Sequence, residues 1–486
     1  MDTQQYILNP REAYIAEQQW RVVKRSVDAR QRELRVHLTI LTDDKGNPIA
    51  KDAPIPLYEP PVFQDVHQAE RSVVIIGAGP AGLFAALTLL EHGIKPIIYE
   101  RGKDVSERKK DIALLNRNEG LNEESNYCFG EGGAGTFSDG KLFSRSKKRG
   151  NMQRVMELFH YFGAPDTVLY EAHAHIGSDK LPGIIKRMRE CILEHGGEIH
   201  FETKVETLKD FKEPVILAIG HSAHDTYRML AAEGVKLETK GFAMGVRIEH
   251  PQALINKLFY HNASTEYVGN ASYSLVTQVD GRGVYSFCMC PGGHIVPAGS
   301  SAGSCVVNGM SASHRNSPYA NSGMVVQINP EDIEGDDPLR GLAYQEMLER
   351  LAFEHGKAPY IAPAQRMKDF VEGKESKSLP ACSFLPGIVA SRLDQWLPAH
   401  IGKRLQQGFR DFDKKHPGFL TNDAVIVGVE SRSSSAVRIP RDPETLEAVN
   451  TPGLYPCGEG AGYAGGITSS ALDGIRAALA SIRVHE

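Results

Sequence analysis

The stretch that decides the fold is Arg71-Ser-Val-Val-Ile-Ile-Gly-Ala-Gly-Pro-Ala-Gly82. Within it, Val73 to Ile76 is an uninterrupted apolar run, which is typical of a strand buried on both faces. The residues 83–90 that follow have the pattern of a helix, and Ile94 to Tyr99 is a second apolar run. Strand, helix and strand in this order predict a unit that opens a parallel sheet, and therefore an α/β fold.

A glycine-rich turn separates the first strand from the helix. Gly77 permits the tight turn, Gly79 lets the backbone approach a pyrophosphate, and Gly82 lets helix and strand pack closely. The helix N-terminus offers free N–H groups and a positive dipole end to the phosphates. Glu100 ends the second strand at the distance where a carboxylate binds an adenosine ribose and repels the 2′-phosphate of NADP. The residues predicted to bind a dinucleotide here are Gly77, Gly79, Pro80, Ala81, Gly82, Glu100 and Arg101.

A second glycine-rich turn near the other end of the chain, TPGLYPCGEGAGYAGGI (451–467), indicates which dinucleotide binds. It resembles the second FAD motif of glutathione-reductase-like flavoproteins, in which a Gly–acid pair binds the ribityl chain and the next helix points at the flavin. Glu459 stands where the acid is usually Asp, and its side chain is one methylene longer. The resemblance implies FAD, held without a covalent bond, and implies as its contacts Gly458, Glu459, Gly465, Gly466 and Ile467.

A third fragment, VILAIG (215–220), resembles the segment at which such chains re-enter the FAD-binding domain. The resemblance implies that Gly220 and the backbone of Val205 also contact the cofactor. Because fragments so far apart in sequence serve one ligand, we expect a glutathione-reductase-like Rossmann domain that is discontinuous. The GxGxxG at 77–82 is the one that follows a four-residue apolar run and opens a helix, so a dedicated NAD(P)H domain of the disulfide-reductase kind is not supported.

Composition and local pattern divide the chain into three units. Residues 1–70, which end in a proline-rich linker, are expected to form a small α/β domain, and residues 236–420 an inserted α+β domain with the substrate pocket. The FAD-binding domain then consists of residues 71–235 and 421–486. The uncharged run 72–90 has the length of a membrane span, but its glycines and proline favour a strand, a turn and a helix.

The 486 residues include 55 basic and 60 acidic ones, for a formal charge of −5. This near-balance disfavours a nucleic-acid or anionic-membrane partner. Seven cysteines make no disulfide framework and predict a reduced protein. With no signal peptide recognisable at the N-terminus, we expect a cytoplasmic location.

Four further segments resemble one family. They are FGEGGAGTFSDGKL (129–142), LAIGHSAHD (217–225), FCMCPGGHIVPAGS (287–300) and GVESRSSSAVRIPRD (428–442). Together they are similar to the bacterial and plastid family of uncharacterised FAD-dependent dehydrogenases, which is related to aminoacetone oxidase-like and GidA-like flavoproteins. The resemblance covers nearly the whole chain. It implies the fold and FAD, and it assigns no substrate.

The first of these segments holds candidate contacts to FAD and to substrate. Gly132, Gly133 and Ala134 could turn backbone N–H groups toward the pyrophosphate or the flavin N5 edge, or could form only a bend. Lys141 could stabilise negative charge on a reduced flavin or on a substrate carboxylate. An ordinary surface lysine is the alternative.

Cys288 and Cys290 form a CxC pair. In a strand, alternate residues share a face, so both thiols would point the same way. Three interpretations stay open: a redox relay to the flavin, a thiol pair that faces the substrate, or two small packed residues. A disulfide between them would be strained. Zinc would need more ligands than a nearby His294 adds, so we expect no metal.

Charged residues elsewhere also leave alternatives open. Arg432 could fix a carboxylate or phosphate by bidentate bonds, or could form an ion pair with Glu430. His221 and His224 could act as acid or base, or could serve a cap or turn. The basic cluster 145–149 is either solvated surface or a transient docking site for an NADPH phosphate. NAD(P)H therefore stays open as a transient reductant.

These observations predict an FAD-dependent oxidoreductase that passes a hydride through flavin N5 to or from a small-molecule substrate, carboxylated or phosphorylated if the cationic candidates bind it. Its candidate catalytic residues are Lys141, Cys288, Cys290 and Arg432. Two other classes stay open, namely FAD-dependent RNA modification of the GidA-like type and FAD binding without turnover. The sequence does not indicate the oligomeric state.

Overall fold

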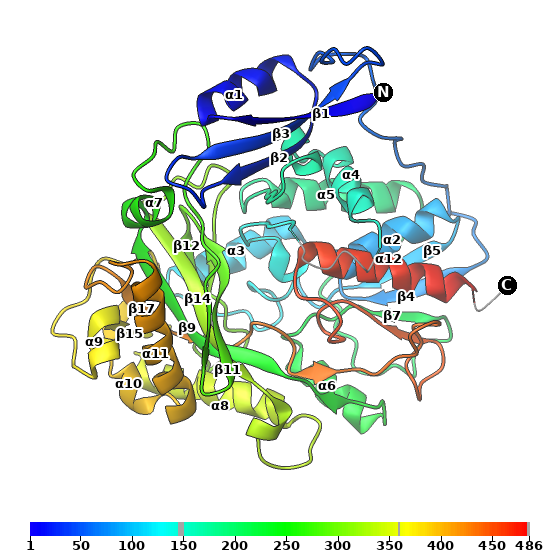
Figure 1. Ribbon diagram of the computed structural model, residues 1–486. Coiled ribbons are helices and arrows are strands. Elements are labelled where there is room, and N and C mark those ends of the chain that lie inside the picture. Colours follow the sequence, from blue (N-terminus) through cyan, green and yellow to red (C-terminus); the bar gives the residue numbers. More distant parts are fainter. Residues whose placement is uncertain (144–149, 358–359, 484–486) are drawn as a thin grey trace.

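The computed structural model describes residues 1–143, 150–357 and 360–483 and has a mixed α/β fold (Figure 1). A small N-terminal unit, dark blue in the figure, lies against both a parallel-sheet unit and an antiparallel-sheet unit. Within the described ranges, no helix is both long enough and apolar enough to cross a membrane.

The N-terminal unit is a three-stranded antiparallel sheet covered by one helix. Its strand order is β1-β3-β2. In β3, every second residue is buried, and Leu38 and Ile40 pack under the helix residue Ala16. The elements are β1 (Asp2–Leu8), α1 (Pro10–Gln19), β2 (Val22–Asp28) and β3 (Arg35–Thr42).

The parallel-sheet unit has the strand order β19-β7-β4-β5-β6, with every pair parallel. The central strand β4 is apolar on both faces because helices cover both sides of the sheet. Helix α2 packs beside α12, which ends the described chain (Figure 1). The main elements are β4 (Ser72–Ile76), α2 (Pro80–Glu91), β5 (Lys95–Tyr99), α3 (Val105–Asn116), α4 (Met152–Tyr161), α5 (Leu181–Glu194), β6 (Glu198–His200), β7 (Val215–Leu217), α6 (His224–Ala232), β19 (Leu454–Pro456) and α12 (Ile467–Arg483).

The antiparallel-sheet unit is built on seven strands in the order β10-β11-β14-β9-β17-β15-β16. Strands β9 and β14 pair over ten residues each and form its centre. Its main elements are β9 (Phe242–Pro251), α7 (Gln252–Tyr260), β10 (Val276–Val279), β11 (Arg282–Cys290), β12 (His294–Pro297), β13 (Val307–Met310), β14 (Tyr319–Ile328), α8 (Arg340–His355), β15 (Ala362–Arg366), α9 (Met367–Glu372), β16 (Ile388–Ala390), α10 (Leu393–Trp396), α11 (Ala399–Lys415) and β17 (Val425–Glu430).

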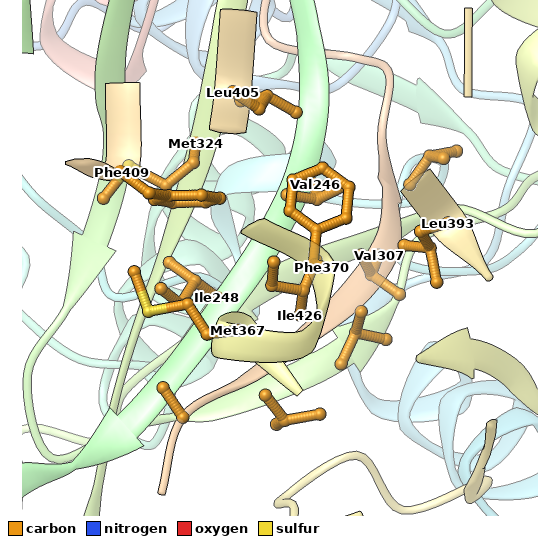
Figure 2. Packing of buried hydrophobic residues seen from close by; sticks show 14 of the residues in the cluster. Val246, Ile248, Val307, Met324, Met367, Phe370, Leu393, Leu405, Phe409 and Ile426 are labelled. Atoms are coloured by element: carbon orange, nitrogen blue, oxygen red, sulfur yellow. The ribbon is translucent and has the colours of Figure 1, made fainter. Parts of the chain in front are cut away.

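One apolar face of α11 builds the core on this sheet. Leu405 and Phe409 are four residues apart, so they lie on the same side of the helix and are fully buried. Figure 2 shows them beside Met324 of β14 and Val246 of β9. The polar residues described below lie on the opposite face of the sheet.

Several elements differ from the sequence-based expectation. The helical spacing of residues 394–415 predicts one helix, but the structure has two, α10 and α11, because Pro398 cannot donate a backbone hydrogen bond within a helix. The pattern of residues 198–205 predicts a strand, which in the structure ends at His200. The boundary expected at residue 420 falls before β17, which pairs with β9, so the antiparallel sheet extends past that boundary.

Candidate functional site

The glycine-rich turn after β4 contains two kinds of glycine. A Cβ atom on Gly77 would lie 2.4 Å from the Ala218 carbonyl oxygen, and one on Gly82 would lie 2.0 Å from the Gly77 carbonyl oxygen. Backbone packing alone therefore requires these two glycines. A Cβ on Gly79 would meet only the Cα atom of Gly133, at 3.8 Å. The open side of Gly79 leaves room for a ligand against the backbone.

Helix α2 begins at this turn without a capping side chain. Gly79 is its N-cap, the structure shows no side-chain hydrogen bond at this cap within the described residues, and Pro80 opens the first turn. The predicted loop residue Gly132 lies against the same turn, since its N–H donates to the Ala78 carbonyl at 2.8 Å. An uncapped helix end beside a glycine loop is a favourable place for a phosphate.

The carboxylate of Glu100 ties these glycine segments together. It accepts hydrogen bonds from the N–H groups of Ala78 at 2.9 Å, Gly102 at 2.8 Å and Gly130 at 3.0 Å. Since a carboxylate has about four acceptor positions, room for a ribose hydroxyl remains. The neighbouring Arg101 is instead held by Asp225 in a bidentate pair, at 2.8 and 2.9 Å.

The C-terminal glycine turn and the end of β7 border an open space. A Cβ atom added to Gly220, Gly465 or Gly466 would have no described atom within 4 Å, apart from atoms of its two neighbours in the chain. Gly135 and Ile467 line one small apolar cavity with the start of α2. Segments from the two ends of the parallel-sheet unit thus meet around one region.

Four other predicted contacts have more specific positions. The N–H of Gly458 donates to Asp473 at 2.8 Å. The Glu459 carboxylate lies 3.5 Å from the Nδ1 atom of His221. Val205 is half-buried against the apolar cluster of the parallel sheet, and Ala134 lies in the short helical turn 133–135.

A cluster of buried polar side chains reaches the same region from the antiparallel sheet. We call Lys141, Arg247, Cys288, Cys290 and Glu430 the thiol–cation cluster. Arg247 of β9 is fully buried and donates to the Glu430 carboxylate at 2.8 Å and to the Cys288 carbonyl at 2.6 Å. It also lies 3.8 Å from the Cys290 sulfur. The guanidinium thereby joins three strands of the sheet.

Lys141 enters the cluster from the loop after 132–136. Its Nζ atom lies 3.8 Å from the Cys290 sulfur and 3.6 Å from the Asp139 carboxylate. Arg315 binds Asp139 through two nitrogens, at 3.0 and 2.5 Å. Burial opposes ionisation of Asp139, but Lys141 and Arg315 outweigh it and lower its pKa to about 2.

The Lys141 side chain is partly exposed. It keeps 35% of its exposed area, although burial is the largest single influence on its pKa. Cys290, Cys288 and Asp139 outweigh that influence and raise the pKa, so the ammonium stays charged. A charged group that is accessible yet surrounded by protein fits the wall of a ligand site.

The two thiols do not lie on a regular strand, and the expectation that they do is wrong. The register of β11 shifts between Phe287 and Cys290, and Cys288 has a φ of +45°. The Cys290 S–H nevertheless donates to the Cys288 carbonyl at 3.3 Å. A hydrogen bond from Cys290, then Lys141 and Arg247, hold the pKa of Cys288 well below its usual value despite burial.

Glu430 links the thiols to the cofactor side. Burial raises the pKa of its carboxyl group to about 7, although Arg247 works in the opposite direction. His221, at the end of the β7 segment, is close enough to Glu430 to interact with its charge and lies beside Glu459. On the other side, the Thr468 hydroxyl of α12 donates to the Leu142 carbonyl at 2.7 Å.

The structure separates Arg432 from this cluster. Its guanidinium binds Glu349 through two nitrogens, both at 2.8 Å, and donates to the Ser300 hydroxyl at 2.6 Å. The ion pair considered between Arg432 and Glu430 is therefore wrong, because Glu430 pairs with Arg247. His224 contacts Glu346 at 2.9 Å. The basic cluster Arg145, Lys147, Lys148 and Arg149 lies outside the described residues.

Sequence reasoning missed Arg247, Asp139 and Arg315 as site residues. The signal for Arg247 was a charge inside the otherwise apolar strand segment 242–248, because a buried charge needs a partner. Its partner lies far away in sequence, so the pair could not be named in advance. Asp139 and Arg315 are joined only by tertiary packing.

Two family models match parts of this chain. Residues 70–213 match the model of an FAD binding domain, and residues 241–433 match that of an FAD-dependent protein, C-terminal domain-like. A protein of Clostridium beijerinckii, described as uncharacterized, is 42% identical over 94% of this chain and 91% of its own. The chain belongs to an FAD-binding protein family.

Solved flavoprotein structures show a more distant likeness to this FAD-binding protein. CtdE in complex with FAD is 10% identical over 85% of this chain and 84% of its own, with a TM-score of 0.31. The amino acid oxidase NikD is 12% identical over 85% of this chain and 95% of its own, with a TM-score of 0.33.

The residues present fit FAD. The open side of Gly79 and the uncapped start of α2 suit a pyrophosphate, and the Glu100 carboxylate has an acceptor position left for a ribose. The free Cβ directions of Gly465 and Gly466 leave space at the start of α12. Leu142, the chain neighbour of Lys141 in the thiol–cation cluster, accepts a hydrogen bond from Thr468 at the start of α12.

Proposed function

We propose that the protein is an FAD-dependent oxidoreductase that passes a hydride through flavin N5 to or from a small substrate with a carboxylate or phosphate group. The observation that carries the proposal is the thiol–cation cluster, a set of buried titratable groups at the edge of the space bordered by glycines. A site that only stored FAD would not need such groups, because burying charges is costly.

When bound, FAD supplies the carrier of the hydride. The chain's own residues bind, orient and exchange protons. The Lys141 ammonium, paired with the Asp139 carboxylate that Arg315 also binds, would hold an anionic group of the substrate. The role of Arg432 is structural: its guanidinium is hydrogen-bonded to Glu349 and so holds the segment after Glu430 in place.

The first test is the visible spectrum of the purified protein, in which we expect the flavin bands near about 370 and 450 nm. Anaerobic addition of NADH, NADPH and a panel of carboxylated or phosphorylated alcohols and amines should bleach the band near about 450 nm with at least one donor. Protein without flavin, or flavin that stays oxidised with every donor and, once reduced, stays reduced with every acceptor, would overturn the proposal.

A matched pair of variants assigns the anion-binding role. In Lys141→Met we expect the flavin to stay bound and its reduction by the anionic donor to be lost. Lys180→Met changes an exposed lysine at the start of α5, and we expect reduction of the flavin by the same donor to be unchanged. Equal rates in the two variants would remove Lys141 from the mechanism.

A further inference from the structure

Among the described residues, the thiol–cation cluster has one cation, Lys141, without a carboxylate of its own. Arg247 is paired with Glu430, and Arg315 holds both oxygens of Asp139. Lys141 is only 3.6 Å from the same Asp139, and its other neighbour is the Cys290 sulfur. Because a buried cation requires a counter-charge, the thiol pair is the group placed to supply it.

The two thiols lie beside two cations. Cys290 is fully buried, and its S–H donates to the Cys288 carbonyl at 3.3 Å. The Cys290 sulfur lies 3.8 Å from both Lys141 Nζ and Arg247 Nη2, and Cys288 is the more exposed residue of the pair. The positive φ of Cys288, uncommon outside glycine, turns the backbone so that its carbonyl meets Arg247.

We propose that the Cys288–Cys290 pair is the base of the reaction and takes a proton from an alcohol or amine substrate. The inference rests on the proposed function, because the proton that the thiol pair accepts leaves the substrate together with the hydride. The carbon–hydrogen bond of the substrate breaks and its electron pair leaves with the hydrogen for the oxidised flavin. The oxygen–hydrogen or nitrogen–hydrogen bond breaks toward the thiolate sulfur, and a C=O or C=N bond forms. One hydride and one proton leave the substrate, so charge and atoms balance.

Glu430 is the next proton acceptor behind the thiols. Its charge interacts with that of Cys288 on one side and that of His221 on the other. Burial raises the pKa of its carboxyl group to about 7, so it can hold a proton near neutral pH. The other charged groups that face the pair are Lys141, Asp139, Arg247 and Arg315. Despite burial, opposite charges nearby raise the pKa of Lys141 and Arg247 and lower that of Asp139, so these three stay ionised in this range.

The test measures alkylation of Cys288 by iodoacetamide in the holoenzyme, between about pH 5 and about pH 10, from the mass of the modified peptide. At neutral pH we expect Cys288 to react about tenfold or more faster than Cys382, a half-buried thiol whose pKa burial raises. Lys141→Met should slow the reaction of Cys288 at neutral pH about fivefold or more, and Cys382→Ser should leave it unchanged. A wild-type Cys288 that reacts only as the pH passes about 9 would overturn the proposal, whether or not the variants fold.

A second measurement tests whether the Cys288–Cys290 pair accepts protons or transfers electrons. Holoenzyme treated with diamide and then titrated anaerobically with dithionite should take up two electrons per flavin, because a disulfide between residues two apart is strained and the cations stabilise the thiolate. Uptake of four electrons would assign the pair to electron transfer and overturn the proposal. Absence of flavin would instead sink the proposed function, whereas the alkylation profile needs no flavin to be read.

Discussion

Gly79 and Gly82 are three residues apart in one turn, and the structure gives them different tasks. We expect Gly79→Leu to fold normally and to lose FAD, because the new side chain meets only the Gly133 Cα atom and fills the space left for the pyrophosphate. We expect Gly82→Ala to destabilise the protein by about 3 kcal/mol or more, because its Cβ would lie 2.0 Å from a carbonyl oxygen. Flavin content and urea unfolding of both variants check this.

The two variants control for each other. A Gly79→Leu protein that retained stoichiometric flavin would show that the pyrophosphate lies elsewhere. A Gly82→Ala protein as stable as the wild type would show that the backbone of the turn can shift by the distance that the clash requires.

The arginines show where residue-level reading of the sequence stops. The segment around Glu430 and Arg432 indicated buried ion pairs correctly, since both side chains are buried and paired. It could not indicate which partner each has, because Arg247 and Glu349 come from other strands and helices. Residue type predicts that a buried charge has a partner, and only tertiary packing selects it.

At the scale of single elements, Glu131 joins two helices and gives the fold a pH dependence. Its carboxylate accepts a hydrogen bond from the Val105 N–H at the start of α3 and lies 3.2 Å from Arg189 of α5. Burial raises the pKa of this fully buried carboxyl group to about 7. An acid with a raised pKa in the folded state contributes most at low pH, and its contribution is lost as the pH rises through about 7.

We therefore expect ionisation of Glu131 to lower the free energy of unfolding of the wild type by up to about 3 kcal/mol between about pH 4.5 and about pH 7. In Glu131→Gln the group cannot ionise, so this part of the pH dependence should vanish while the rest is unchanged. Chemical denaturation of both proteins at several pH values measures it. Parallel stability curves for the two proteins would contradict the assignment.

Elements with a strong local pattern were predictable, and those set by their neighbours were not. The apolar runs of β4 and β5 and the glycine turn between them lie where the sequence predicts. Strand β14 was missed because its first half, Tyr319 to Gly323, is polar and small. It is a central strand only because Asn321 and Ser322 find hydrogen-bond partners inside the sheet.

At the scale of the whole molecule, Arg25 of the N-terminal unit holds the other two units. Its side chain pairs with Glu171 at 2.8 Å in the parallel-sheet unit and donates to the Tyr267 carbonyl at 3.2 Å in the antiparallel-sheet unit. We expect Arg25→Ala to lower the free energy of unfolding by about 1–3 kcal/mol, because Glu171 is left partly buried without its partner. Limited proteolysis within the proline-rich segment 52–61 should become faster.

Arg30→Ala is the matched control, since Arg30 is 85% exposed and pairs only with its near neighbour Asp28. We expect no change in proteolysis or unfolding beyond about 0.5 kcal/mol. If Arg25→Ala behaved like Arg30→Ala, the N-terminal unit would be held by its apolar contacts and not by this arginine.

The cofactor region itself is assembled from both ends of the parallel-sheet unit, since α2 and its turn pack beside α12 and the C-terminal glycines. FAD bound across these segments must therefore resist their separation on unfolding. We expect added FAD at about 100 times its dissociation constant to stabilise the apoprotein by about 2.7 kcal/mol, seen as a rise in Tm that grows with FAD concentration. Gly79→Leu should unfold at the Tm of the apoprotein and show no such rise. A rise of the same size in Gly79→Leu would mean that the dinucleotide turn is not the site through which FAD holds the two ends of this unit together.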